Sequence, residues 1–182
     1  MKRTRRCKNC GERFLPTYSS VRETHCQKSE CFQEFLKAEM LKQAKKRKAK
    51  YYRESKTLQD HIQDTQQVFN RYIRERDKGH KCISCQKPPK KKNAGHYHNA
   101  NNHWFVRFNE DNCHLQCEAC NNSLSGNLIN YRKHLLTKIG SERLSELDSI
   151  ANKVANYTIP EVLEIKEYYK EKLKMLKTLN ND

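Results

Sequence analysis

Eight of the nine cysteines in this chain of 182 residues fall into two groups of four that have the spacing of metal ligands. The first group is Cys7, Cys10, Cys26 and Cys31, and the second group is Cys82, Cys85, Cys117 and Cys120. A Cys-x2-Cys pair supplies two thiolates from one tight turn, and zinc prefers four such ligands in a tetrahedron. We therefore predict two structural Zn²⁺ sites, each of which clamps the ends of a loop.

The first group gives the weaker signal, because four residues separate Cys26 from Cys31 and because His25 could replace one sulfur. Two other interpretations stay open for both groups. Free buried thiols behave as small apolar residues, and four cysteines can also hold an iron–sulfur cluster. Free thiols leave the paired spacing unexplained. We interpret the ninth cysteine, Cys113, as a packing thiol, with a nucleophilic role as the alternative.

The loop inside the second group, between Cys85 and Cys117, is rich in histidine and asparagine. If residues 93–98 form a strand, His96 and His98 share one face of it, because alternate residues of a strand point the same way. If residues 112–117 form a second strand, Asn112 and His114 share a face, and Cys113 points in the opposite direction, toward a core. A hairpin closed by zinc would then bring the three histidines and Asn112 together.

This arrangement resembles the HNH, or ββα-metal, nuclease finger, in the variety that two Cys-x2-Cys pairs brace. His96 matches the first histidine of that motif, Asn112 the middle asparagine, and Asn121, directly after Cys120, the final position. The resemblance implies that His96 is the general base that takes a proton from an attacking water, and that Asn112 fixes the backbone of the loop. It also implies a catalytic divalent ion, Mg²⁺, on the scissile phosphate.

One position departs from the HNH pattern. Many HNH enzymes have Asp or His directly before the catalytic histidine as a metal ligand, whereas this chain has Gly95, which has no side chain to offer. The resemblance therefore implies that Asn121 holds the catalytic ion together with His98 or His114, or with more water in place of protein ligands.

The whole chain also resembles the NinG/Rap recombination endonuclease family of lambda-like phages. The segments that carry the resemblance are RCKNC at 6–10, FNRYIRERDKGHKCISC at 69–85, AGHY at 94–97, RFNEDN at 107–112, CEAC at 117–120 and SGNLINYR at 125–132. It implies a metal-dependent, structure-directed endonuclease that acts on branched DNA such as Holliday junctions and D-loops.

The charge of the chain agrees with a nucleic-acid partner. The formal net charge is +16, and such an excess favours polyanions because contact with phosphates releases condensed counterions. The residues expected to contact DNA are Lys45, Lys46, Arg47, Lys48, Lys90, Lys91, Lys92 and Arg107, and a further basic run spans residues 2–8. Each run could instead be a solvated surface. We find no apolar run long enough to span a membrane and no secretory leader, so we expect a reducing, cytoplasmic location.

Periodicity and composition indicate a small α+β protein in three parts. These are a zinc knuckle at 1–34, a basic helical linker at 35–57, and an HNH-like domain at 58–182 whose zinc-braced finger core spans 81–128. We predict helices over 58–77 and 128–139, a third from Ser141, and a fourth from Thr158, where Glu161 completes a capping box. A symmetric junction would suit a homodimer paired through the final helix.

Two functions follow, and they differ in what they require of the polar loop. The first is a metal-dependent endodeoxyribonuclease of branched DNA. The alternative is a non-catalytic zinc-finger protein that binds DNA as a recombination accessory or regulatory factor. Only the nuclease needs His96 and Asn121 for more than folding.

Overall fold

The computed structural model describes residues 3–16, 24–26 and 28–179, so the basic residue Lys2 and part of the predicted knuckle lie outside the described residues. The chain divides into two compact units, residues 1–56 and residues 57–182. Among the described residues, no helix combines the length and the apolar character that crossing a bilayer requires.

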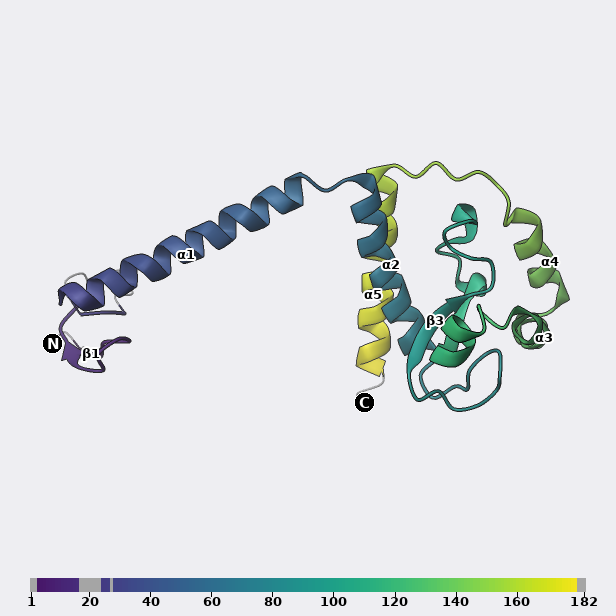
Figure 1. Ribbon diagram of the computed structural model, residues 1–182, viewed down its shortest axis with the longest axis horizontal. Coiled ribbons are helices and arrows are strands. Elements are labelled where there is room, and N and C mark those ends of the chain that lie inside the picture. The colour runs from purple at the N-terminus through teal and green to yellow at the C-terminus, as the bar shows by residue number, and fades with distance from the viewer. Residues whose placement is uncertain (1–2, 17–23, 27, 180–182) are drawn as a thin grey trace. The chain divides into compact units, whose positions relative to one another are not determined.

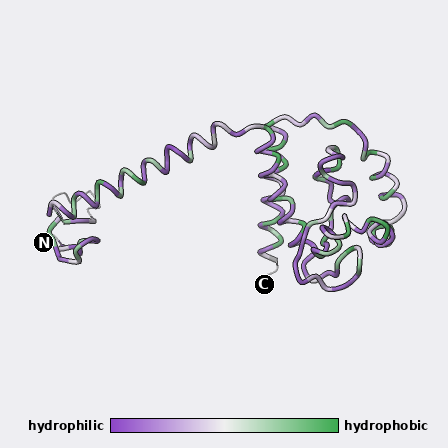
Figure 2. Tube along the Cα trace, in the orientation of Figure 1, coloured by the Kyte–Doolittle hydropathy of each residue, from purple (hydrophilic) through white to green (hydrophobic). Residues whose placement is uncertain are grey.

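The first unit consists of a small ribbon and a long helix. Strand β1 (Arg5–Arg6) pairs antiparallel with strand β2 (Arg13–Phe14), and helix α1 spans Ser29–Glu54. Cys31 lies in the first turn of α1, so the boundary predicted at residue 34 falls inside this helix. Beyond that turn the helix is largely exposed and predominantly hydrophilic along its length, as Figure 2 shows. It therefore forms from local propensity rather than from burial of an apolar face.

The second unit is organised around two helices that lie side by side, α2 (Leu58–Arg76) and α5 (Ile159–Leu179) (Figure 1). Ile62 and Phe69 of α2 pack with Val162 and Tyr169 of α5 in one buried cluster. Both helices begin as the sequence predicts. In α5, the Thr158 backbone N–H donates to the carboxylate of Glu161, and in α2 the capping box pairs Thr57 with Asp60.

A two-stranded hairpin packs on α2. Strand β3 (Lys92–His96) pairs antiparallel with strand β4 (Cys113–Cys117). The register places His96 opposite Cys113 and Gly95 opposite His114. Because residues directly opposite each other point to the same side of a sheet, His96 shares a face with Cys113 and not with His114.

Helices complete the second unit after the hairpin. A short π-helical turn at Ala119–Ser123 leads to α3 (Leu128–Ile139) and α4 (Ser141–Ile150). The four predicted helices of this unit are present, and Gly140, with φ of 84°, separates α3 from α4. Tyr131 and Leu135 of α3 and Leu144 of α4 form a second buried cluster. The fold is thus a small α+β structure.

The end of α2 anchors the hairpin through a buried carboxylate. Asp77, which is 3% exposed, accepts a hydrogen bond from the Leu115 backbone N–H at 2.9 Å and two from the guanidinium of Arg76. Arg76 also donates to the Cys113 carbonyl at 2.9 Å. Burial by itself raises the pKa of Asp77, but these donors outweigh it and lower that pKa to about 2. The charged pair therefore fixes β4 against α2.

Candidate functional site

The second cysteine group has the geometry of a zinc site. The four sulfurs of Cys82, Cys85, Cys117 and Cys120 all lie within 4.8 Å of one another. The sulfurs of Cys85 and Cys117 are 3.8 Å apart, and four sulfurs placed 2.3 Å from zinc in a tetrahedron are also separated by about 3.8 Å. The Cys120 backbone N–H and the Asn127 side chain donate to these sulfurs, which favours thiolates. The group could hold one structural zinc ion.

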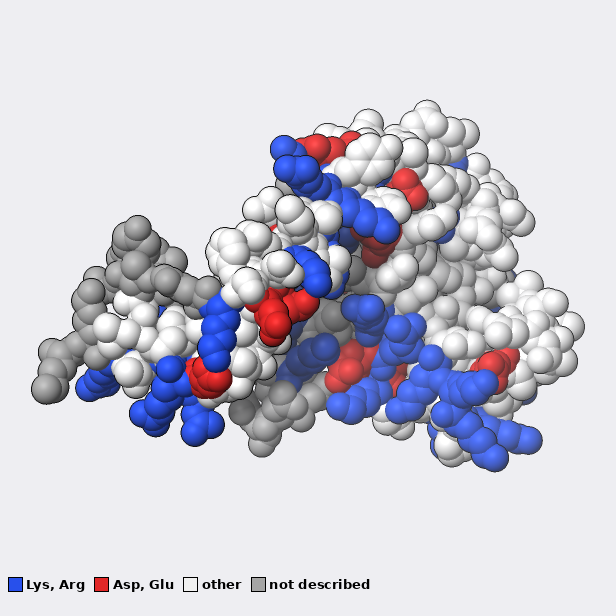
Figure 3. All heavy atoms as spheres, turned by 60° about the vertical axis from the view of Figure 1, so that its left-hand side comes forward, with Lys and Arg blue, Asp and Glu red and all other residues white. Residues whose placement is uncertain are grey.

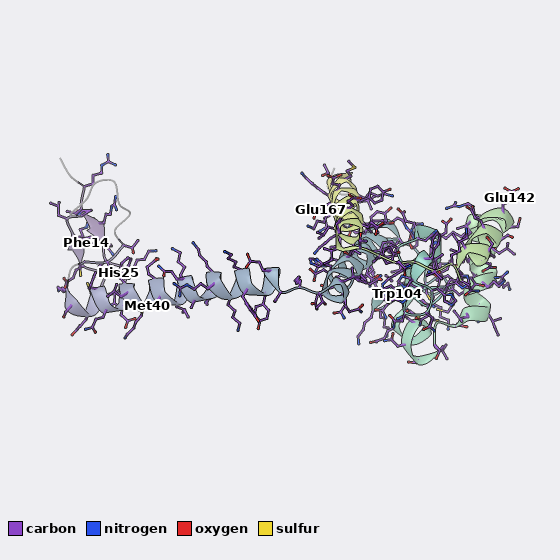
Figure 4. All side chains as sticks on the ribbon, turned by 90° about the horizontal axis from the view of Figure 1, so that it is seen from above. Phe14, His25, Met40, Trp104, Glu142 and Glu167 are labelled. Atoms are coloured by element: carbon purple, nitrogen blue, oxygen red, sulfur yellow. The ribbon has the colours of Figure 1, made fainter. Side chains whose placement is uncertain are left out.

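The first cysteine group has the same geometry. The sulfurs of Cys7, Cys10, Cys26 and Cys31 also lie within 4.8 Å of one another, and Cys10 and Cys26 are 3.7 Å apart. Cys31 completes the group. His25, labelled in Figure 4, instead bonds the Thr24 hydroxyl through Nδ1 at 2.9 Å, and its ring contacts the ring of Phe35. All nine cysteines are described, and none of them forms a disulfide. This group too could hold zinc.

A cleft of about 610 Å³ opens at the end of β3. Its lining includes three histidines, His96, His98 and His103, together with Asn121 from the π-helical turn. Ser125 and Gly126 form another part of the wall. Both residues have positive φ, and the turn that they make redirects the chain from Asn121 into α3.

His96 is held as a neutral base at the inner end of this cleft. Its Nε2 lies 3.0 Å from the backbone carbonyl of Arg107, which can only accept, so Nε2 carries the proton and Nδ1 keeps its lone pair, 3.7 Å from Sγ of Cys113. Burial lowers the pKa of His96 to about 4, so the imidazole is uncharged at neutral pH. The neighbouring Cys113 is fully buried, and burial raises the pKa of its thiol, which supports the prediction of a packing role.

Asn112 ties the loop around the cleft together. The side chain is fully buried, and its Oδ1 accepts a hydrogen bond from the His98 backbone N–H at 2.7 Å. Its Nδ2 donates to the carbonyls of His98 and Val106, each at 3.0 Å. Val106 directly precedes Arg107, whose carbonyl orients His96. Asn112 therefore fixes both sides of the loop that holds the imidazole.

His98 and His103 each use one ring nitrogen for structure and leave the other facing the cleft region. His98 Nε2 lies 2.9 Å from Asp148, which also accepts from Arg132 at 2.7 Å. His103 Nδ1 lies 3.2 Å from the Ala151 carbonyl, and the two imidazoles are 5.1 Å apart. Burial lowers the pKa of His98. The second nitrogen of each ring carries a lone pair and could contact a substrate or an ion.

The structure corrects two expectations about site residues. His114 is 2% exposed, its Nδ1 is 3.3 Å from the Tyr131 hydroxyl, and it is not among the residues that line the cleft. Arg107, expected to contact DNA, is 6% exposed. Its guanidinium donates to Gln66 and to the Ala100 carbonyl, so it stabilises the loop instead.

Sequence reasoning did not identify two members of this site. His103 lies in the same polar loop as His96 and His98, so the third histidine of HYHNANNH was a signal available in the sequence. Asp148 lies on α4, fifty residues after His98, and only the tertiary fold brings the two side chains together. Trp104, labelled in Figure 4, packs beside the main core cluster, and its Nε1 donates to the Asn101 carbonyl.

The basic residues lie on exposed surfaces of both units. Lys45, Lys46, Arg47 and Lys48 are exposed on α1, and Lys90, Lys91 and Lys92, at the start of β3, are exposed as well. Lys91 pairs with Glu118 at 3.0 Å. The run at β3 lies next to the second cysteine group, at the opposite end of the strand from His96, about 13 Å along the chain. Lys and Arg side chains outnumber acidic ones on the face shown in Figure 3.

Comparison with known proteins places the chain in one family. Residues 1–179 match the family described as "Bacteriophage Lambda NinG protein". Protein ninG of Escherichia phage lambda is 41% identical over 122 residues, which cover 66% of this chain and 59% of that protein. Protein ninG of Salmonella phage P22 is 40% identical over 117 residues, which cover 64% of this chain and 57% of that protein.

The chain thus spans less than two thirds of the length of these relatives. No solved structure matches it. The family match covers nearly the whole chain, including both cysteine groups and the cleft between β3 and α3. The chain therefore belongs to the NinG family of bacteriophage proteins.

Proposed function

We propose that this protein is a structure-specific DNA endonuclease that cleaves branched recombination intermediates by metal-assisted phosphodiester hydrolysis. The observation that carries the proposal is His96, a neutral imidazole whose Nε2 is fixed on the Arg107 carbonyl in a cleft lined by polar side chains. Two antiparallel strands and a following helical turn around four cysteines are also the parts of an HNH-like ββα-metal finger, which the sequence resembles.

In this mechanism His96 takes a proton from a water molecule that attacks phosphorus in line. The lone pair that would take this proton is on Nδ1, which lies 3.7 Å from Sγ of Cys113, and loss of the proton from Nε2 is opposed by its bond to the Arg107 carbonyl. Asn112 holds that carbonyl in place through its neighbour Val106. The base is therefore oriented before substrate binds, which lowers the entropy cost of reaching the transition state.

The cleft also suits a divalent ion such as Mg²⁺. Asn121 offers an amide oxygen, a ligand type that Mg²⁺ binds. His98 and His103, each with one ring nitrogen that carries a lone pair, line the same cleft. Such an ion, when bound, stabilises negative charge on the scissile phosphate and on the leaving oxygen. The two cysteine groups, in contrast, suit zinc as a structural ion that holds the hairpin and the knuckle.

DNA recognition is proposed to rest on phosphate contacts. Contacts between phosphates and the exposed lysines of α1 and of the start of β3 carry no base sequence information. Phosphate contacts read the path of the backbone, which agrees with an enzyme that recognises DNA shape. The choice of Holliday junctions and D-loops follows from the resemblance to recombination endonucleases.

The test compares cleavage of a labelled four-way junction and a matched linear duplex, with and without Mg²⁺. We expect the wild type and the His80→Ala variant, which alters an exposed histidine, to cut the junction only with Mg²⁺. The His96→Ala variant, at equal zinc content, should bind the junction and leave it intact. Binding without cutting by the wild type under Mg²⁺ and Mn²⁺ would instead support a non-catalytic zinc-finger DNA-binding protein.

A further inference from the structure

Gly95, directly before the proposed base, is glycine for reasons of space. It lies inside β3, and its φ is not among the positive values, so its backbone suits any residue. A Cβ at this position would collide with Oε1 of Gln116 and would lie 2.9 Å from Oδ1 of Asn121. The oxygens of Gln116 and Asn121 thus flank the one point where a side chain of residue 95 would begin.

Gln116, on β4, carries an unpaired oxygen in a fully buried position. Its Nε2 donates to Ser84 Oγ at 2.7 Å and to the Gly126 carbonyl at 2.5 Å. Because a carbonyl only accepts, the amide cannot be turned the other way, and Oε1 must face Gly95. Oε1 has no hydrogen-bond partner among the described residues. Burying such an acceptor unpaired costs about 1–3 kcal/mol, so its retention needs a reason.

We propose that Oε1 of Gln116, which takes up the space that a Cβ of residue 95 would need, is a ligand of the divalent ion together with Oδ1 of Asn121. This inference rests on the proposed nuclease function and deepens it. A residue at position 95 could reach the same point from β3, and Gln116 reaches it from the neighbouring strand β4. Gln116 Oε1 can thus occupy this position only because residue 95 has no Cβ.

The ligand chemistry fits a hard cation. Amide oxygens bind Mg²⁺ and Mn²⁺, and both ions keep several waters when the protein supplies few ligands. Neither Gln116 nor Asn121 carries a charge, and the described residues that line the cleft include no carboxylate. Binding to the free protein should therefore be weak, and phosphate oxygens of DNA would complete the shell.

The experiment measures Mn²⁺ binding to the full, zinc-loaded chain by the loss of the electron paramagnetic resonance signal of free Mn²⁺. Four proteins are compared: the wild type, Gln116→Ala, Gly95→Ala with Gln116→Ala, and Gly95→Asp with Gln116→Ala. Removing Gln116 opens the space that a side chain at 95 needs. Before Mn²⁺ affinities are compared, the four proteins are shown to have equal zinc content and similar melting temperatures.

We expect Gln116→Ala to weaken Mn²⁺ binding by about tenfold or more. The Gly95→Asp double variant should recover it, because the carboxylate enters from β3, whereas the Gly95→Ala double variant fills the same space without a ligand and should not. Equal Mn²⁺ affinity of the wild type and Gln116→Ala would overturn the proposal, as would identical behaviour of the two double variants or a wild type that binds no Mn²⁺.

Cleavage of the junction is recorded in parallel to separate the two claims. If the wild type cuts with Mg²⁺ while Gln116→Ala binds Mn²⁺ normally, the nuclease function stands and the role of Gln116 fails. If the wild type does not cut under any divalent ion, the proposed function fails, whatever the manganese titration shows.

Discussion

Replacing Asn112 by Ala should destabilise the second unit by about 3 kcal/mol. The change removes three hydrogen bonds, at 2.7, 3.0 and 3.0 Å, from a side chain that is fully buried. The carbonyl of Val106 keeps the hydrogen bond that it accepts from the Asn109 backbone N–H at 3.2 Å, and the backbone of the half-buried His98 can turn to water. Each of the three lost bonds therefore costs about 1 kcal/mol, which gives the total.

The same change should lower junction cleavage by about 100-fold, because a loop displaced by about 1 Å no longer holds the Arg107 carbonyl against His96. Stability is measured by urea unfolding at constant zinc, and cleavage by single-turnover kinetics at saturating protein. Asn102→Ala, in an exposed position of the same loop, is the matched control and should change neither quantity. A loss below about 1 kcal/mol in Asn112→Ala would refute this account of the loop.

Three further predictions follow. Cys117→Ser should lower the zinc content from two ions to one and unfold the hairpin. Structural zinc contributes about 10–16 kcal/mol, which is comparable with the whole stability of a domain. Retention of both ions would contradict this prediction. Burial lowers the folded pKa of His96 to about 4, below its unfolded value of 6.5, so this contribution to stability is present above about pH 6.5 and is lost as the pH falls toward 4. Between pH 7 and pH 5 the wild type and His80→Gln should each lose about 2 kcal/mol more than His96→Gln in urea unfolding, and parallel losses in all three would count against a buried neutral imidazole. Combining Lys90→Ala and Lys92→Ala should lower the slope of log affinity against log salt by about 2 for duplex and junction alike, and an unchanged slope would remove these side chains from the interface.

Much of the helical framework could be predicted because its signals are local. The apolar spacing of α2, the Thr158–Glu161 box and the position of Gly140 each act within one or two turns of chain. Both cysteine groups were also visible, since zinc ligands in pairs have a fixed short spacing.

The register of the hairpin could not be predicted, and the error had a specific consequence. Alternation along β4 correctly predicted that Cys113 and His114 point to opposite faces. Which of the two lies opposite His96 depends on the register between β3 and β4. A shift of one residue exchanges the faces of a strand, so the pairing with Cys113 placed His114 on the opposite face from His96. His98 likewise lies after the end of β3, where alternation no longer governs its direction.

Contacts between distant segments account for the remaining differences. The bond from His98 to Asp148 and the burial of Arg107 against Gln66 depend on how α4 and α2 pack against the loop. No spacing within the loop encodes either contact. The departure at Gly95 was visible in the sequence, but its relation to Gln116 needed the distance between two strands.

The most direct test of the central claim is chemical rescue of His96→Ala by imidazole in single-turnover cleavage of a four-way junction with Mg²⁺. His96 is only partly buried beside a cleft of about 610 Å³, so free imidazole can enter the space that the variant leaves. The account predicts that His96→Ala is inactive, that imidazole restores cutting at the wild-type positions, and that Asn112→Ala is not rescued. Cutting by His96→Ala at the wild-type rate without imidazole would contradict the assignment of His96 as the base.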